Sequence, residues 1–295
     1  MTGASGFVGL RLLPRLIAEG HETVAAGDEL DIRDLEQFED VVSNASPDAI
    51  IHLAAQSSVA ASRRDPADCF RVNYLGTHNL LDIVMRRLPR ARVLLVGSAD
   101  EYKTTEVDSA PYPETTGLRP GSPYARTKAA AELLGAIASE RGFDIMRTRS
   151  FNHLGAGQSD VFVASSFARQ VAEIAAGVRE PRLAVGNLES VRDFLDVEDV
   201  ISAYICLLDP AIQPGVFNIA SGVPLKIASL LETLIELAGI DPEVTTNPEY
   251  FRPTDHLVGD ATRLREATGW RPTIPIRDAL ASLLEGWRAQ VAQSN

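Results

Sequence analysis

A chain of 295 residues with 45% apolar and 23% charged residues is typical of a globular protein with a large core in one or two domains. Its formal charge of -12 argues against a nucleic-acid partner, because such proteins supply excess Lys and Arg to phosphates. Without an apolar run of about 18 residues or a secretion signal, we expect a cytoplasmic protein with no membrane partner.

The chain opens with MTGASGFVGL, in which Gly3, Gly6 and Gly9 are evenly spaced and a helical pattern follows. Such glycines permit a tight turn, a close approach of backbone to a pyrophosphate, and close packing of a helix on a strand. A simple glycine-rich turn is the alternative. A strand normally leads into a phosphate-binding turn, yet only Met1 and Thr2 precede this one. Loss of a central strand would cost several kcal/mol, so we expect that the natural chain begins upstream.

Four segments are predicted strands, and helical patterns separate them: HETVAAG, PDAIIHLAA, ARVLLVGS and FDIMRTRSFN. This alternation predicts an α/β fold with a Rossmann-like, doubly wound parallel sheet. We assign residues 1–152, rejoined by about 193–222, to a dinucleotide-binding domain. Residues 153–192 and 223–295 form a smaller C-terminal substrate lobe, and ligands are expected between the two.

Two further stretches favour a dinucleotide site. In ELDIRD, Asp31 can accept a hydrogen bond from an adenine amino group, and Ile32 can cover the ring. The small residues of HLAAQSS, at the end of a predicted strand, allow a dinucleotide backbone to approach. Ordinary strand-end packing explains each stretch equally well when it is taken alone.

The segment SPYARTKAAAELLGAIASERG predicts a helix with Ser122 as its N-cap and Gly142 at its exit. Tyr124 then lies in the first turn, and Lys128 lies four residues on, on the same face. We expect the ammonium and the helix dipole to lower the phenol pKa from its usual value of about 10, which suits proton exchange. Such a pair is more often structural, but the strand VLLVGSADEYK ends in Ser98, placed to polarise the same carbonyl oxygen.

Together, TGASGFVG, LAAQSSV, VNYLGTHNLL, Ser98 and YARTK resemble the extended short-chain dehydrogenase/reductases that act on nucleotide sugars. The later motifs RSFNHLGAGQ, VGNLESVRDFLDVEDV, YFRPTDH and GDATRLREATGW are most similar to the branch that contains GDP-mannose 4,6-dehydratase and GDP-4-keto-6-deoxy-D-mannose reductase. The resemblance implies a catalytic triad of Ser98, Tyr124 and Lys128, supported by Asn73. It also implies that Lys128 bonds the nicotinamide ribose.

The same resemblance implies contacts with an NAD(P) cofactor from Gly3, Ser5, Gly6, Phe7, Val8, Gly9, Asp31, Ile32, Leu53, Ala54, Ala55, Gln56, Tyr124 and Lys128. For the sugar nucleotide it implies Asn152, Arg169, Arg192 and Arg252. The guanidinium fork of Arg192 and Arg252 suits the diphosphate. The alternatives are an ion pair between Arg192 and Asp193 and a surface turn at Arg252. The segment RPTDHLVGD is two residues shorter than the family spacing, which leaves the contacts of Thr254 and Asp255 open.

The reaction is predicted from the residues after Ser98. By resemblance, 4,6-dehydratases carry a Glu two residues beyond the catalytic Ser or Thr, whereas this chain has the shorter Asp100, and Glu101 would face the other side. We therefore predict an NAD(P)H-dependent reductase that converts GDP-4-keto-6-deoxy-D-mannose to GDP-D-rhamnose. The alternatives are a GDP-mannose 4,6-dehydratase, another nucleotide-sugar epimerase or dehydratase, and a non-catalytic dinucleotide sensor.

Cofactor and partners follow from a few further positions. Gly27 stands where NAD-preferring relatives carry an acid, with Asp28 one residue later, so NADP(H) is slightly favoured and NAD(H) is also expected to serve. No metal is expected, because Cys69, Cys206 and the five isolated histidines lack ligand spacing. Family resemblance implies a homodimer formed through the Tyr124 helix and NYLGTHNLLDIV, although these apolar faces could equally be core.

Overall fold

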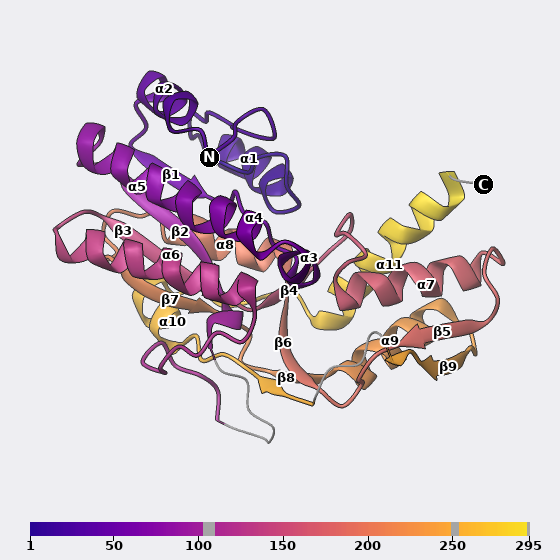
Figure 1. The fold of residues 1–295 in the computed structure, drawn as a ribbon. Helices are drawn as coiled ribbons and strands as arrows, with labels where there is room; N and C mark the ends of the chain where they lie inside the picture. Colours follow the sequence, from indigo (N-terminus) through magenta and orange to yellow (C-terminus); the bar gives the residue numbers. More distant parts are fainter. Residues whose placement is uncertain (103–109, 249–253, 294–295) are drawn as a thin grey trace.

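The main sheet of the computed structural model, which describes residues 1–102, 110–248 and 254–293, has four parallel strands in the order β1-β2-β3-β7 (Figure 1). Their bounds are β1 (Ala49–His52), β2 (Arg92–Ser98), β3 (Ile145–Ser150) and β7 (Gly215–Ile219). The predicted α/β fold with a parallel sheet is confirmed. Ligands of such sheets bind beyond the carboxyl ends of the strands, where β2 ends in Ser98.

The first predicted strand, HETVAAG, is not formed; only Ala26 makes an isolated parallel bridge, to Thr2. The reason is the short partner: residues 1–4 offer few backbone groups to pair with. Thr2 also bridges to His52 of β1, and its N–H donates to the Ile51 carbonyl at 3.0 Å. Residues 1–4 therefore lie between the Ala26 segment and β1.

Alternate residues of each strand enter different cores. In β2, Val93 and Leu95 pack into one core, and Leu94 between them packs into the other. This follows from the two-residue period of a strand, and it covers both faces of the sheet, as parallel sheets require. Helices α2, α5 and α6 supply the first core, and α1, α8 and α10 supply the second (Figure 1).

The helices around the main sheet are α1 (Gly9–Ala18), α2 (Leu35–Ala45), α3 (Val59–Arg64), α4 (Pro66–Phe70), the π-helix η1 (Arg71–Leu75), α5 (Gly76–Arg87), the short 3-10 helix η2 (Ala99–Glu101), α6 (Pro123–Glu140), α8 (Val197–Cys206) and α10 (Thr262–Thr268). Among the residues that the structure describes, no helix combines the length and the apolar character needed to cross a bilayer.

The C-terminal part of the chain builds a third core beside the main sheet (Figure 1). Its members come from α7, α9, α11 and β5, and burying leucines such as Leu230, Leu234 and Leu283 contributes on the order of 2 kcal/mol each. A second sheet, β10-β6-β4 with β8 paired to β6, lies next to it, and β5 pairs with β9. The bounds are β4 (Asn152–Leu154), α7 (Val163–Ala175), β5 (Arg182–Val185), β6 (Val191–Asp196), β8 (Pro224–Lys226), α9 (Ile227–Ala238), β9 (Glu243–Thr246), β10 (His256–Leu257) and α11 (Ile276–Gln293).

Candidate active site

The glycine turn lies so close to its neighbours that side chains would not fit. Gly3 has a φ of 68°, and a Cβ there would lie 2.7 Å from the backbone N of Ala54. A Cβ on Gly9, the first residue of α1, would lie 2.3 Å from the carbonyl oxygen of Gly3. These contacts hold the turn against the chain that leaves β1, and they leave its backbone open to a phosphate group.

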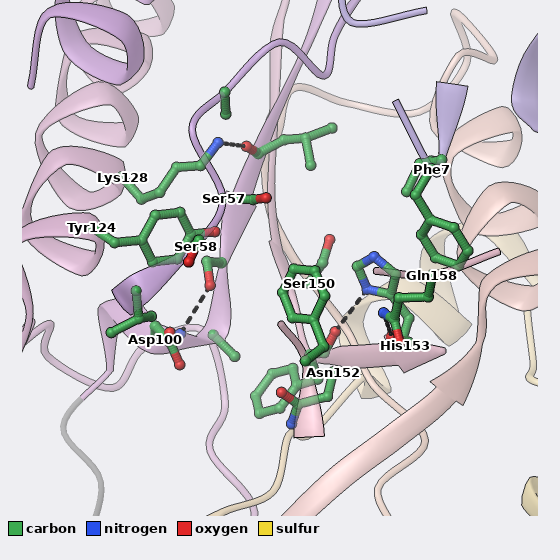
Figure 2. A pocket seen from close by; sticks show the side chains of 18 of the residues that line it. Phe7, Ser57, Ser58, Asp100, Tyr124, Lys128, Ser150, Asn152, His153 and Gln158 are labelled. Carbon is green, nitrogen blue, oxygen red and sulfur yellow. Dashed lines mark hydrogen bonds between the residues drawn. The ribbon is translucent and has the colours of Figure 1, made fainter. Parts of the chain in front are cut away.

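The turn borders a cavity of about 520 Å³. Figure 2 shows Tyr124 and Lys128 of α6 on one side of it and Phe7 and His153 on the other. Predicted site residues that line it are Gly3, Gly6, Phe7, Val8, Gly9, Leu53, Ala55, Ser98, Tyr124, Lys128 and Asn152. Those that do not line it are Ser5, Asp31, Ile32, Ala54, Gln56, Asn73, Arg169 and Arg192. Arg252 lies outside the described residues.

Tyr124 lies in the first turn of α6, as predicted. Ser122 caps this helix by accepting a hydrogen bond from the Ala125 N–H at 3.1 Å. The phenol is buried, and the side chain of Ser98 lies near enough to it to lower its pKa in part. The two groups that would face a carbonyl oxygen, one from a strand end and one from a helix start, are therefore close together.

The expectation that the phenol pKa is lowered is wrong. Burial raises the pKa of Tyr124, the charge of Asp100 raises it further, and the nearby side chain of Ser98 opposes the shift only in part. The Lys128 ammonium instead donates to the Val96 carbonyl at 2.8 Å. Spacing along a helix indicates which groups are neighbours, but the desolvation that dominates here comes from the surrounding fold.

Lys128 is itself perturbed. Burial lowers its pKa to about 8. His52, which the sequence analysis did not assign, contacts Thr2 Oγ1 at 2.8 Å through Nδ1 and Thr77 Oγ1 at 3.3 Å through Nε2. Burial and the charge of Lys128 lower the pKa of His52 to about 3, so its ring is neutral and links the first residues of the chain to α5.

Asn73 lies outside the cavity but supports its wall. Its Oδ1 accepts from the Gln56 N–H at 2.8 Å, and its Nδ2 donates to Thr127 Oγ1 at 3.0 Å. Thr127 in turn donates to the Tyr124 carbonyl at 2.7 Å. Asn73 thus ties the segment after β1 to the first turn of α6 from a π-helix, a local geometry often found at functional sites.

The residues predicted to contact the adenine end of the cofactor make contacts within the protein instead. Asp31 pairs with Arg33 at 2.8 Å, and Arg33 also pairs with Asp68 at 2.9 Å. Ile32 is buried beneath Gly76, where a Cβ would lie 2.3 Å from the Ile32 side chain. At the glycine turn itself, Ser5 Oγ donates to Asp28 at 2.7 Å, which places an acid beside the turn.

On the substrate side, Arg192 pairs with Asp255 at 2.6 Å rather than with its sequence neighbour Asp193. Asp193 is fully buried and accepts hydrogen bonds from Ser221, Gly222 and Gly259. The pKa of Asp100 is raised by burial, lowered by Arg192 and raised by Asp255, so these three groups lie near one another. Arg169 of α7 pairs with Glu173 at 2.7 Å and with Asp160, which precedes the helix, and it does not line the cavity.

Several cavity residues were not assigned from the sequence. The His153 ring stacks on Phe7 with centroids 6.3 Å apart, and the His153 carbonyl accepts from Gln158 Nε2 at 2.7 Å (Figure 2). Burial lowers the pKa of His153. Ser57, Ser58, Asp100, Ser150, Val161 and Phe162 also line the cavity. The motifs HLAAQSS and RSFNHLGAGQ contain most of these residues, but nothing in their spacing indicates which side chains face inward.

A doubly wound parallel sheet with a glycine turn, a strand-end Ser98 and a Tyr124–Lys128 helix defines a short-chain dehydrogenase/reductase. The family model described as GDP-mannose 4,6 dehydratase matches residues 26–283, and the chain belongs to this family.

Individual relatives cover nearly the whole chain. The GDP-6-deoxy-D-mannose reductase of Pseudomonas aeruginosa is 36% identical over 99% of this chain and 98% of its own. The structure of RMD from Pseudomonas aeruginosa, complexed with NADPH, has a TM-score of 0.88 at 36% identity and covers 98% of this chain and 97% of that one. The UDP-glucose 4-epimerase of Thermus thermophilus, in complex with NAD, has a TM-score of 0.85 at 26% identity and covers 97% of both chains.

The lowered pKa of Lys128 predicts an alkaline loss of activity. The ammonium, which is predicted to support the phenolate left by Tyr124, is charged below about pH 8 and loses its proton above it. We expect kcat/KM for carbonyl reduction, which reports the free enzyme, to fall about tenfold per pH unit above pH 8. Deprotonation of Tyr124 does not produce this loss, because its pKa is raised.

The check is a pH profile of NAD(P)H consumption from pH 6 to pH 10. Lys128→Arg, whose guanidinium stays charged throughout, is expected to be slower but without the fall above pH 8. A wild-type profile that stays flat to pH 10 would contradict the assignment.

Proposed function

We propose that this protein is an NAD(P)H-dependent reductase of a nucleotide-linked 4-keto-6-deoxy sugar, converting GDP-4-keto-6-deoxy-D-mannose to GDP-D-rhamnose. The carrying observation is that Ser98 and Tyr124 lie close together at the cavity wall, with Lys128 one helical turn from Tyr124. The 36% identity to a GDP-6-deoxy-D-mannose reductase over nearly the full chain supports the sugar and the base. An intact Ser-Tyr-Lys set disfavours a non-catalytic sensor, which has no need of all three groups.

The cofactor fits the residues that are present. The glycine turn leaves a cradle that any Cβ at Gly3 or Gly9 would fill, and the cavity is large enough for a nicotinamide beside a sugar. When bound, the nicotinamide supplies the hydride that goes to C4 of the sugar. Residues of the turn hold the pyrophosphate, and Lys128 bonds the ribose hydroxyls.

Side chains of the protein act on the carbonyl oxygen at C4 of the sugar. Ser98 Oγ donates a hydrogen bond to it, and Tyr124 transfers the phenolic proton to it as negative charge develops. The Lys128 ammonium then stabilises the phenolate. Because the pKa of Tyr124 is raised, the phenol is fully protonated at neutral pH and ready to act as the acid. The arrangement suits reduction better than oxidation at that pH.

On the substrate side, we propose that residues 153–192 and 223–295 form the sugar-nucleotide lobe. Asn152 lines the cavity at the entrance to this lobe, and Arg192 lies close enough to the cavity residue Asp100 to lower its pKa. Arg252 remains a proposed diphosphate ligand. Arg169, held by Glu173 and Asp160, is proposed only as an outer neighbour of the nucleotide.

We further propose a cytoplasmic homodimer. Exposed apolar side chains support an interface on two neighbouring helical regions: Leu133 and Ile137 of α6 are 60% and 46% exposed, and Phe70 and Leu75 beside η1 are 45% and 38% exposed. Apolar groups gathered in this way favour burial against a second copy.

NADPH is the proposed preferred cofactor, with NADH also used. The relative solved with NADPH supports the first, and the epimerase solved with NAD shows that the fold accepts the second. In this chain, however, Asp28 is held beside the glycine turn by Ser5, and Arg33 is already paired with Asp31 and Asp68. A 2'-phosphate would therefore lie near a carboxylate of the same charge sign, and this repulsion limits the preference for NADPH over NADH.

This charge yields a prediction. Asp28→Asn keeps an oxygen for the Ser5 hydroxyl but removes the charge, and two unit charges about 4 Å apart in well-solvated surroundings interact by about 1 kcal/mol. We expect the KM for NADPH to fall about fivefold, with little change for NADH. Steady-state kinetics with each cofactor measures the difference, and Asp241→Asn, an exposed acid far from the turn, is the matched control. An equal change for both cofactors would contradict a specific effect on the 2'-phosphate.

A second candidate is a GDP-mannose 4,6-dehydratase, because Asp100 lines the cavity and burial raises its pKa, as a general acid requires. Its shorter side chain argues against this role. Incubation with GDP-mannose alone, and separately with the 4-keto-6-deoxy derivative plus NADPH, divides the two functions. We expect product only in the second incubation; product from GDP-mannose alone would refute the reductase.

Removal of the phenol tests the proposed chemistry. Tyr124→Phe is expected to lose about 100-fold or more of turnover, because the proton donor is gone, while it retains cofactor binding. Ketone reduction is followed by NADPH absorbance, and binding by cofactor fluorescence. Tyr74→Phe, whose hydroxyl does not line the cavity, is the control. Full activity in the Tyr124 variant would rule out the proposed acid.

A further inference from the structure

A buried acid that the mechanism above does not use lies directly behind the catalytic serine. Glu101 ends η2, the short helix that follows β2, and its side chain is 0% exposed. Its Oε1 accepts from the Ser98 N–H at 2.8 Å, while Ser98 Oγ accepts from the Asp100 N–H at 3.2 Å. This reciprocal capping box fixes the backbone of Ser98 at the end of the strand.

The chain leaves room for this carboxyl group. A Cβ on Gly97, the residue before Ser98, would lie 2.7 Å from Glu101 Oε1 and 2.3 Å from the Thr148 carbonyl oxygen. The glycine in β2 is therefore required by the acid on one side and by the neighbouring strand on the other. A larger residue at position 97 would displace the carboxyl group, and with it the hydrogen bond to Ser98.

Glu101 has no ion pair among the residues that the structure describes. Glu132 of α6 is buried and makes two hydrogen bonds to Arg149, at 2.6 and 2.7 Å. Arg149 also donates to the Tyr102 hydroxyl at 2.8 Å. Arg149 thus pairs with Glu132 and makes no hydrogen bond to Glu101, and the nearby Lys128 ammonium donates to the Val96 carbonyl. An ionised Glu101 would therefore be a buried charge without an ion pair, which is costly. Burial and the charge of Glu132 raise the pKa of Glu101 well above its ordinary value, whereas Glu132 keeps the ion pair.

Glu101 also connects the two elements that carry the catalytic groups. It bonds the end of β2, which holds Ser98, and it lies next to Glu132, one turn beyond Lys128 on the helix that also holds Tyr124. An ionised Glu101 would place negative charge behind the serine and the lysine, where the phenolate of Tyr124 must form. A neutral acid keeps the hydrogen bond without that charge.

We propose that Glu101 is a positioning residue that, as a neutral carboxylic acid, fixes Ser98 relative to Tyr124 and Lys128 for carbonyl polarisation. The inference rests on the proposed reductase function. It differs from a purely structural role because it requires the neutral form of the side chain. Gln, which is neutral and of the same shape, should then replace Glu, and an aliphatic residue should not.

The kinetic test compares Glu101→Gln with Glu101→Leu in ketone reduction. We expect the Gln variant to keep kcat within about threefold of the wild type at pH 7. The Leu variant should lose about 10- to 100-fold in kcat, the effect of a small misplacement, with the KM for cofactor unchanged. Glu140→Gln and Glu140→Leu, at the exposed end of α6, are matched controls. A Gln variant as slow as the Leu variant, or a Leu variant with full kcat, would overturn the proposal.

A stability measurement decides the question even if the Leu variant does not fold. Because the pKa of Glu101 is raised in the folded protein, the stability that this acid contributes is present below its unfolded pKa of about 4.3 and is lost as pH rises through the folded value. The melting temperature of Glu101→Gln minus that of the wild type should therefore increase as pH rises from 5 to 9. A difference that does not change with pH would overturn the neutral acid. Failure of the wild type to reduce the ketone would instead count against the proposed function, and the melting comparison would still stand.

Discussion

The hydrogen bond from Lys128 to the Val96 carbonyl joins the helix that carries Tyr124 to the strand that ends in Ser98. Asn73 of η1 ties the segment after β1 to the same helix through Gln56 and Thr127, and Glu101 holds the backbone of Ser98 from behind. The geometry of a small reacting centre thus depends on polar contacts that are themselves buried, where each is stronger than in water.

Few side chains around this junction carry a charge. His52 and Glu101 are both buried in their neutral forms. Arg149 forms an ion pair with Glu132. Among the residues that the structure describes, Lys128 is therefore the single cation at the centre of the site. Further out, Asp100, Arg192 and Asp255 form a mixed group beside the cavity. An acidic protein of charge -12 therefore relies on backbone amides of the glycine turn and a few local arginines to bind an anionic ligand.

The sequence predicted those features of the fold and site that depend on residues close together in the chain. The Ser122 cap, the helical spacing of Tyr124 and Lys128, and the strand that ends in Ser98 depend on neighbouring residues, and each was predicted from the sequence. The failures depended on partners far along the chain. HETVAAG lacks a long strand to pair with, and Arg192 meets Asp255 because β6 pairs with β10. The direction of the Tyr124 pKa was wrong because burial, which spacing does not reveal, outweighs the nearby ammonium.

The central claim is that this site delivers one hydride to C4 of a keto sugar with net consumption of cofactor. The most direct measurement is turnover of the GDP-linked 4-keto-6-deoxy sugar with NADPH that carries deuterium at the transferred position. The account predicts one deuterium at C4 of the product and one cofactor oxidised per product molecule. Product without deuterium at C4, or formed while the cofactor is regenerated, would contradict it.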